Sequence, residues 1–337
     1  MLRIARTTVM RGPVTDLARS LAAAGVGAVG LFALACSDST SPANSSAPAV
    51  TQPSTPSAAV VPCPLRVCAR IVYAYSPIQN AFTNLYSMNA DGSNKKMLGK
   101  GARPAWSTDH LKIAYVSLAN GYDIFTMNPD GSGVAQLTFS ASEDVDPSWS
   151  PDGKHIAFSS NRSGGTYDIW IMEANGANPI RFTTTDDAHE MTPAWSPDGK
   201  RIAFTSQPTN SALMQLRIID IATKTVTVPP VATKLSYYPA WSPDGKLLAF
   251  ASEKSVESCG IWILDMSSTA SISPFKGAGY GRCTHPSFSP DGKQLVFTNY
   301  YLDGSMIQKA NIDGTNGYTG MTSGPPTRSE TPVYAFR

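Results

Sequence analysis

An eight-residue string constrains the fold of this chain more than any other feature. The string reads Pro-x-aromatic-Ser-Pro-Asp-Gly-Lys, and an apolar run such as Ile-Ala-Phe follows it. Proline presets φ for the first turn position, Asp bonds its own backbone and Gly accepts a positive φ, so the string predicts a tight turn between two strands. Near-intact copies begin at Pro147, Pro193, Pro239 and Pro286, and a worn copy begins at Pro104.

The spacing of these hairpins predicts a β-propeller. The copies recur at roughly 43–47 residues, which is the length of a four-stranded propeller blade. Five complete blades then start near residues 102, 145, 191, 237 and 284. Residues 69–100 supply three further strands, and residues 330–336 supply one, with Tyr334 at the tryptophan position. Joining them predicts an all-β, six-bladed propeller of four-stranded antiparallel blades, closed by the C-terminal strand.

The first 61 residues are predicted to direct export rather than to fold. Residues 1–35 combine scattered arginines with an apolar run that is too short to span a bilayer comfortably, as in a signal peptide. Cys36 follows this run and is the candidate lipidation site of a bacterial lipoprotein; the alternative is ordinary cleavage, which leaves a soluble secreted protein. Residues 36–61 predict a disordered Ser/Pro/Thr/Ala tether, and residues 62–337 the propeller.

Charge argues against nucleic acid as a partner. The formal charge of the full chain is +2, and removal of residues 1–35 takes away four arginines and one aspartate, which leaves −1. Binding to phosphates needs a basic patch, and the sequence has no run rich in lysine or arginine.

We expect a monomer that touches the membrane only through its lipid anchor, in the bacterial outer membrane, facing the periplasm or the cell surface.

One face of the predicted propeller varies from blade to blade, and we call it the variable face. It carries the connections between the second and third strands of each blade and between one blade and the next. Function on a repeat scaffold tends to follow such variation. The residue before each blade proline is expected near the mouth of the axial channel on this face. The candidate ligand-binding residues are Arg103, Asp144, Asp146, His189, Glu190, Tyr238, His285 and Glu330.

An acidic arc is expected within this set. Its members are Glu143, Asp144, Asp146, Asp186, Asp187 and Glu190, with His189 among them. Oxygen-rich clusters suit a divalent cation, but the spacing matches no ligand motif, and a solvated acidic rim is the alternative. No cofactor is predicted and the metal is unknown. No catalytic residue is assigned, because the sequence has no nucleophile elbow, phosphate loop or His-Glu-x-x-His string.

Cysteines and aromatic residues are interpreted as structural. Besides Cys36 the chain has four cysteines, an even number that suggests disulfides in an exported protein. Of three possible pairings, Cys63–Cys68 and Cys259–Cys283 are favoured.

The tryptophans recur at blade positions and predict packing between blades. His110 and His155 are expected to be exposed at the turns, and the candidates for an aromatic sugar platform are Tyr237, Tyr238, Tyr280, Tyr300 and Tyr301.

The repeated hairpin resembles that of the TolB-type β-propeller family, and the resemblance covers about residues 69–337. It implies a propeller, but the α/β domain that precedes the propeller in TolB has no counterpart in the tether. Related propellers also precede the hydrolase domain of prolyl oligopeptidase-like enzymes. The expected function is that of a non-enzymatic envelope lipoprotein, whose propeller binds an envelope protein or peptide. The alternatives are a metal-assisted lyase or hydrolase and a carbohydrate-binding propeller that uses the axial pocket.

Overall fold

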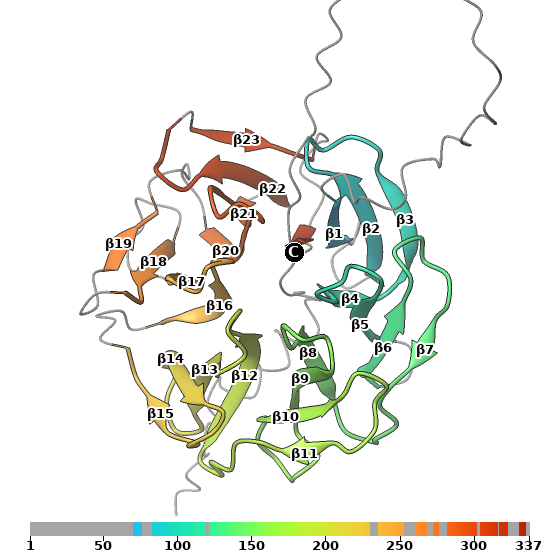
Figure 1. The fold of residues 1–337 in the computed structure, drawn as a ribbon, viewed down its shortest axis with the longest axis vertical. Coiled ribbons are helices and arrows are strands. Elements are labelled where there is room, and N and C mark those ends of the chain that lie inside the picture. Colours follow the sequence, from blue (N-terminus) through green and yellow to red (C-terminus); the bar gives the residue numbers. More distant parts are fainter. Residues whose placement is uncertain are drawn as a thin grey trace, which may run out of the picture.

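The computed structural model shows six four-stranded antiparallel sheets arranged around a central axis (Figure 1). It describes residues 70–75, 83–118, 121–229, 235–252, 260–267, 272–275, 282–301, 304–315, 317–322 and 330–334. The predicted all-β, six-bladed propeller is therefore confirmed. Residues 1–69 lie outside the described residues, so the signal peptide, the tether and the lipidation of Cys36 stay predictions.

Each blade follows one strand order from the axis to the rim, and the innermost strand is the one that ends in the aromatic residue of the repeat. From inside to outside, the strands are as follows: blade 1, β24 (Glu330–Tyr334), β1 (Arg70–Tyr75), β2 (Asn84–Asn89) and β3 (Lys96–Lys100); blade 2, β4 (Ala102–Trp106), β5 (Ile113–Ser117), β6 (Asp123–Met127) and β7 (Ala135–Gln136); blade 3, β8 (Asp144–Trp149), β9 (His155–Ser160), β10 (Asp168–Glu173) and β11 (Ile180–Arg181); blade 4, β12 (Ala188–Trp195), β13 (Arg201–Pro208), β14 (Gln215–Asp220) and β15 (Val226–Thr227); blade 5, β16 (Tyr237–Trp241), β17 (Leu247–Ala251), β18 (Ile261–Asp265) and β19 (Ile272–Pro274); blade 6, β20 (Arg282–Phe288), β21 (Gln294–Tyr301), β22 (Gly304–Asn311) and β23 (Tyr318–Gly320).

The ring is closed by the pairing of its two ends. Strand β24 pairs antiparallel with β1, with Tyr334 opposite Ile71 and Val333 opposite Val72. The last strand of the chain therefore completes the first blade, as the sequence predicts. Without this pairing, β1 would present an open edge at the axis.

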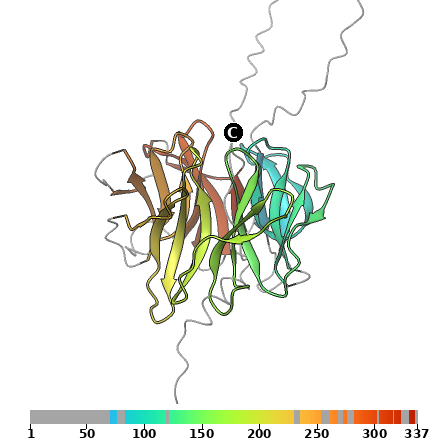
Figure 2. The same cartoon turned by 60° about the horizontal axis from the view of Figure 1, so that its bottom comes forward.

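The core is made of layers between neighbouring blades. Strand residues are buried on both sides of each sheet, and one cluster joins Leu216 and Ile218 of blade 4 to Trp241 and Phe250 of blade 5. The indole N–H of Trp241 donates to the carbonyl of Ala194 in the preceding blade (3.1 Å). The tryptophans thus hold blades together, and Figure 2 shows the blades standing side by side around the axis.

The turns that repeat from blade to blade all lie on one face of the propeller, which we call the turn face. It holds the turns between the first and second strands and between the third and fourth strands of each blade. In each complete hairpin a serine hydroxyl donates to the turn aspartate, as Ser242 does to Asp244 (2.6 Å). His155 is partly buried here, contrary to expectation, because its ring stacks on Trp195 of the next blade with centroids 6.3 Å apart. His110 is likewise partly buried, next to Trp106.

Glycine in the outer turn lets consecutive blades approach closely. A Cβ on Gly176 would lie 2.6 Å from the carbonyl oxygen of Leu137 in the preceding blade, and Gly131 has the same relation to Leu98. Gly92 of blade 1 packs in this way against Met321 of blade 6. The repeated contact continues across the closure, so the seam between the two chain ends is packed like the others.

Deletion of residues 330–337 should destabilise the whole domain. The deletion removes the ladder between β24 and β1 and exposes β1 as an edge strand, so we expect a loss of more than about 4 kcal/mol from a total that is typically about 5–15 kcal/mol. Urea unfolding followed by tryptophan fluorescence measures the effect. A synthetic peptide of residues 330–337 should restore part of the loss by adding the strand in trans; unchanged unfolding of the truncated chain would contradict the closure.

Substitution of Gly176 by alanine should cost more than the same change at Gly165. Both residues have a positive φ, 89° and 90°, so each substitution carries a backbone strain of about 1 kcal/mol. Only the Cβ at Gly176 meets a neighbouring blade, because nothing lies within 4 Å at Gly165. We expect a further loss of about 1–3 kcal/mol for Gly176→Ala in thermal unfolding, and equal losses for the two variants would refute the close approach.

Candidate functional site

Five of the innermost strands contain a β-bulge directly before or at the blade proline. The register with the second strand shifts there, for example between Ala102 and Ala105 and between Val145 and Ser148. The residue before the proline takes a left-handed conformation in all five blades, which costs free energy for a side chain other than glycine. These residues are Arg103 (φ 49°), Asp146 (54°), Thr192 (53°), Tyr238 (55°) and His285 (51°). In blade 1, Thr331 lies opposite Ala74 in unshifted register.

Bulges re-aim side chains, and four of these five side chains contact one another in pairs. Nη1 of Arg103 in β4 lies 3.0 Å from Oδ1 of Asp146 in β8, and both residues are buried. The rings of Tyr238 in β16 and His285 in β20 lie with centroids 3.7 Å apart. We call Arg103, Asp146, Tyr238 and His285 the axial cluster; it joins residues from four different blades.

Charge is balanced within the axial cluster. Burial opposes the charged form of Arg103, but the acidic groups around it, first of all Asp146, together outweigh burial and raise the pKa of the guanidinium. Burial raises the pKa of Asp146, and the positive charge of Arg103 opposes that rise. Burial, and then the charge of Arg103, lower the pKa of His285 well below its usual value. The cluster is therefore one ion pair beside a neutral imidazole, whose Nδ1 lies 2.7 Å from the hydroxyl of Thr284.

Asp144 and Glu190, two residues before the bulge residues, have a different role from the one expected. Both are fully buried between blades rather than open at the channel mouth. Their backbone N–H groups donate to the carbonyls of Tyr122 and Tyr167 in the preceding blade, each at 2.7 Å. The position thus ties consecutive blades together, and burial raises the pKa of the Glu190 carboxyl.

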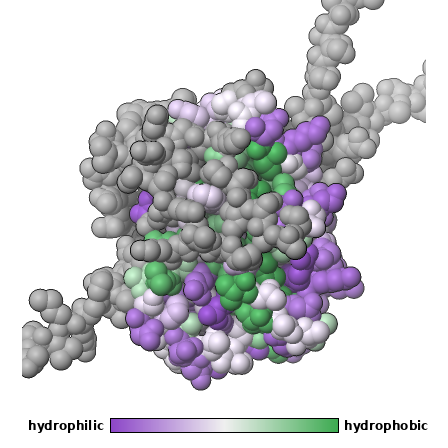
Figure 3. All heavy atoms as spheres, turned by 90° about the vertical axis from the view of Figure 1, so that its left-hand side faces the viewer, coloured by the Kyte–Doolittle hydropathy of each residue, from purple (hydrophilic) through white to green (hydrophobic). Residues whose placement is uncertain are grey.

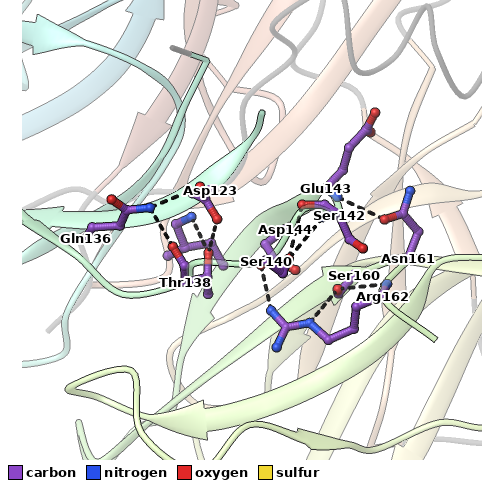
Figure 4. A network of polar contacts seen from close by, with 11 residues as sticks. Asp123, Gln136, Thr138, Ser140, Ser142, Glu143, Asp144, Ser160, Asn161 and Arg162 are labelled. Atoms are coloured by element: carbon purple, nitrogen blue, oxygen red, sulfur yellow. Dashed lines mark hydrogen bonds and ion pairs between the residues drawn. The ribbon is translucent and has the colours of Figure 1, made fainter. Parts of the chain in front are cut away.

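Two groups of polar contacts lie in blades 2 and 3, one around Asp123 and the other around Asp144 and Arg162 (Figure 4). Oδ2 of Asp144 accepts hydrogen bonds from Arg162 (2.6 Å) and from the hydroxyl of Ser140 (3.1 Å). Asp123, at the start of β6, accepts from Gln136 and Thr138. Burial raises the pKa of Asp123.

Sequence reasoning missed Asp123 and its counterpart Asp168 in β10, which pairs with Arg181 (3.0 Å). The signal was the repeated Tyr-Asp-Ile at residues 122–124 and 167–169, which marks an aspartate at the start of the third strand. Arg162 lies in a loop with no repeat, and nothing in the sequence singles it out.

The acidic arc does not form one open cluster in the structure. Asp144 pairs with Arg162 and Asp146 with Arg103, and the exposed Asp186 pairs with Arg181 at 2.7 Å. The solvated rim, the alternative reading, is limited to exposed residues such as Asp186 and Asp187. Within the described ranges, no group of three or more His, Cys, Asp or Glu residues could hold a metal ion. The divalent cation therefore gains no support from these residues.

A smaller set of candidates remains accessible on the variable face. His189 is half-buried, and its Nδ1 accepts a hydrogen bond from the backbone N–H of Tyr167 (3.3 Å). The Tyr167 hydroxyl donates to Glu143, which is partly exposed. Phe139, in the connection from blade 2 to blade 3, is 78% exposed. Sequence reasoning did not select Phe139.

The remaining predicted residues are the tyrosines of the sugar platform, the cysteines and Glu330. Tyr237 and Tyr238 are buried, so they offer no open platform for a sugar. Cys283 is disulfide-bonded, while Cys63, Cys68 and Cys259 lie outside the described residues, as does Tyr280. Glu330 lies in β24, and Tyr301 lies in β21 next to the half-buried Tyr300.

The buried His285 should make stability depend on pH. In the unfolded chain a histidine titrates near pH 6.5, whereas the folded protein keeps His285 neutral to a lower pH because its pKa is lowered. Below about pH 6.5 the unfolded state therefore binds a proton that the folded state does not, and stability falls as the pH falls.

His285→Gln should remove this component, with a slope difference of up to about 1.4 kcal/mol per pH unit between about pH 6.5 and 5. Urea unfolding at several pH values measures it, and His155→Gln on the turn face is the control. Parallel pH profiles for the wild-type chain and His285→Gln would show that the imidazole is not kept neutral.

Comparisons with known proteins agree with this architecture. A family model described as the Tricorn protease N-terminal beta propeller domain matches residues 103–257. The structure of TolB from Acinetobacter baumannii superimposes with a TM-score of 0.66 at 23% identity, over 80% of this chain and 67% of that one. A putative TolB from Agrobacterium tumefaciens gives 0.60 at 20% identity, over 75% and 88%.

Sequence similarity to the curated proteins covers between 23% and 70% of this chain. The Tol-Pal system protein TolB of Zymomonas mobilis is 37% identical over 77 residues, which are 23% of this chain and 17% of that protein. The chain spans about a third or less of the length of the curated relatives it matches. The resemblance read from the repeated hairpins is confirmed by these matches, and the chain has a β-propeller fold similar to that of TolB.

Proposed function

We propose that this protein is a non-enzymatic envelope lipoprotein whose propeller binds a protein or peptide through the variable face. The TolB-like fold supports the role of a protein-binding scaffold. The contrast between the two faces carries the proposal. The turn face repeats one serine–aspartate turn, as in Ser150–Asp152 and Ser196–Asp198, whereas the connections on the variable face differ from blade to blade.

The accessible part of the variable face suits contact with another protein. Phe139 offers a large exposed apolar side chain, and aromatic anchors contribute strongly to protein interfaces. Glu143 and His189 are also accessible in part, and the Tyr167 side chain contacts both. The axial cluster and the network around Asp144 are buried beneath, so they hold these loops in place and do not themselves have to reach the partner.

Export and anchoring rest on the sequence. The apolar run before Cys36 and the tether after it support a lipid-anchored protein in the bacterial envelope, at the outer membrane and facing the periplasm or the cell surface. The part of the chain that the structure describes contains no helix long and apolar enough to cross a membrane. Membrane contact through the lipid anchor alone and a monomeric state are parts of the same proposal.

The enzymatic and carbohydrate alternatives lack a specific observation in their favour. The described residues hold no cluster suited to a metal ion, and the axial cluster is committed to internal contacts. Tyr237 and Tyr238, two of the sugar-platform candidates, are buried. On the described residues, protein or peptide binding is the function that the geometry supports best.

Exchange of Phe139 for aspartate should weaken partner binding. The change removes an exposed aromatic side chain from the variable face and adds a charge there, so a partner that covers it should bind at least about tenfold more weakly. Pull-down from an envelope extract identifies the partner, and surface plasmon resonance with the purified partner measures the affinity. Leu111→Asp is the matched control, because Leu111 is 55% exposed on the turn face. Equal losses for both variants, or none for Phe139→Asp, would argue against the variable face.

A further inference from the structure

A cleft opens on the turn face at the seam between the first and the last blade. It has a volume of about 540 Å³, which lies within the size range of small-ligand sites. Three turns border it: Ala90 and Asp91 between β2 and β3, Asp291 to Lys293 between β20 and β21, and Asp313 between β22 and β23. No site is predicted here from the sequence, because the repeated turns are interpreted as structural.

The residue that distinguishes this cleft is Lys309 in β22. In every blade, the central position of the second strand, which is alanine or valine, lies opposite one residue of the third strand. In blade 6 this partner is Lys309, opposite Val296. The corresponding residues of the other blades are uncharged: Ser87, Thr126, Ile171, Ile218 and Ile263. A lysine therefore stands in the cleft where the repeat otherwise carries no charge.

Lys309 is held in a partly dehydrated position. Its Nζ donates to the carbonyl of Ala90 across the seam (3.1 Å). Burial lowers the pKa of its ammonium group, and the charge of Asp91 opposes that shift. An ammonium group donates up to three hydrogen bonds, and Lys309 is one of the residues that line the cleft.

Aspartates of three turns line the same cleft as this lysine. Asp91, Asp291 and Asp313 each use Oδ1 to hold their own turn, with a serine or threonine hydroxyl at 2.5–2.6 Å. Those hydrogen bonds lower the pKa of Asp91 and Asp313, so both are ionised at neutral pH. Each of these aspartates has a second carboxylate oxygen, Oδ2, besides the one that holds the turn. Lys293 adds a second ammonium group.

The lining thus presents both signs of charge within one small volume. A purely anionic ligand would be attracted to Lys309 and Lys293 but repelled by three carboxylates. A purely cationic ligand would meet the reverse. A ligand that carries a carboxylate and an ammonium group a few atoms apart can satisfy both sets at once, because charge-assisted hydrogen bonds are stronger than neutral ones.

We propose that this cleft binds a zwitterionic ligand of the amino acid or short-peptide class. The ligand carboxylate lies against Lys309 and Lys293, and its ammonium group lies against Asp91, Asp291 and Asp313. The site is on the face opposite to the proposed partner surface, so it is a second binding function and does not depend on the first.

Calorimetric titration of the full chain with glycylglycine at low salt tests the proposal. We expect one saturable site at millimolar or lower concentration, and no saturation with the N-acetyl, C-amide form of the same dipeptide. Lys309→Met and Asp291→Asn should each weaken binding at least about tenfold, because each removes a charged partner of one end of the ligand. Asp291→Asn keeps the Oδ1 that caps the turn, so it remains informative if Lys309→Met fails to fold.

Two matched controls separate binding from structure. Lys96→Met removes a lysine whose Nζ donates to the Asp130 carbonyl across the next seam (3.1 Å). Asp244→Asn changes the same turn position in blade 5, with the same serine contact as Asp291 (2.6 Å). Both should bind glycylglycine like the wild-type chain. No saturable binding, equal binding of the capped dipeptide, or equal losses in variants and controls would each overturn the proposal.

Discussion

The backbone ladder between β24 and β1 is the interaction on which the rest of this structure depends. It brings the last strand of the chain to the first blade, with Val333 opposite Val72, and so leaves no open edge at the axis. The close contact of Gly92 with the Met321 carbonyl continues the packing across the same seam. Because the ring is closed, the innermost strands of all blades face one axis, and side chains that are far apart in sequence meet there.

Polar side chains gather around the axis, whereas apolar side chains fill the layers between blades. A bulge in each of five innermost strands directs one non-glycine residue inwards at the cost of a left-handed backbone. Arg103 and Asp146 neutralise each other, and the tilted rings of Tyr238 and His285 are in contact. This arrangement makes the centre a rigid, buried cluster. The accessible candidate residues lie elsewhere, Phe139 in the connection from blade 2 to blade 3 and the half-buried His189 in β12.

Departures from the repeat indicate function better than the repeat itself does. Exposed apolar side chains lie among polar ones on the outer surface of the molecule (Figure 3), and many belong to the short outermost strands, such as Ile180 and Val226. They follow the blade pattern. Lys309 breaks that pattern, since the equivalent residue of every other blade is uncharged. The turn face, which the sequence presents as uniform, therefore carries one position that the fold alone does not require.

The sequence by itself determined the propeller, its six blades and its closure. Those features depend on turn chemistry and strand patterns that act over a few residues, and the same patterns recur in each blade. Counting from the blade prolines also predicted that four residues lie at one end of the axis: Arg103, Asp146, Tyr238 and His285. Only the tertiary structure decided that these four are buried, that Asp144 pairs with Arg162, and that Lys309 stands in a cleft. Charge pairing and burial depend on which blades are neighbours and how closely they pack, and no local pattern encodes that distance.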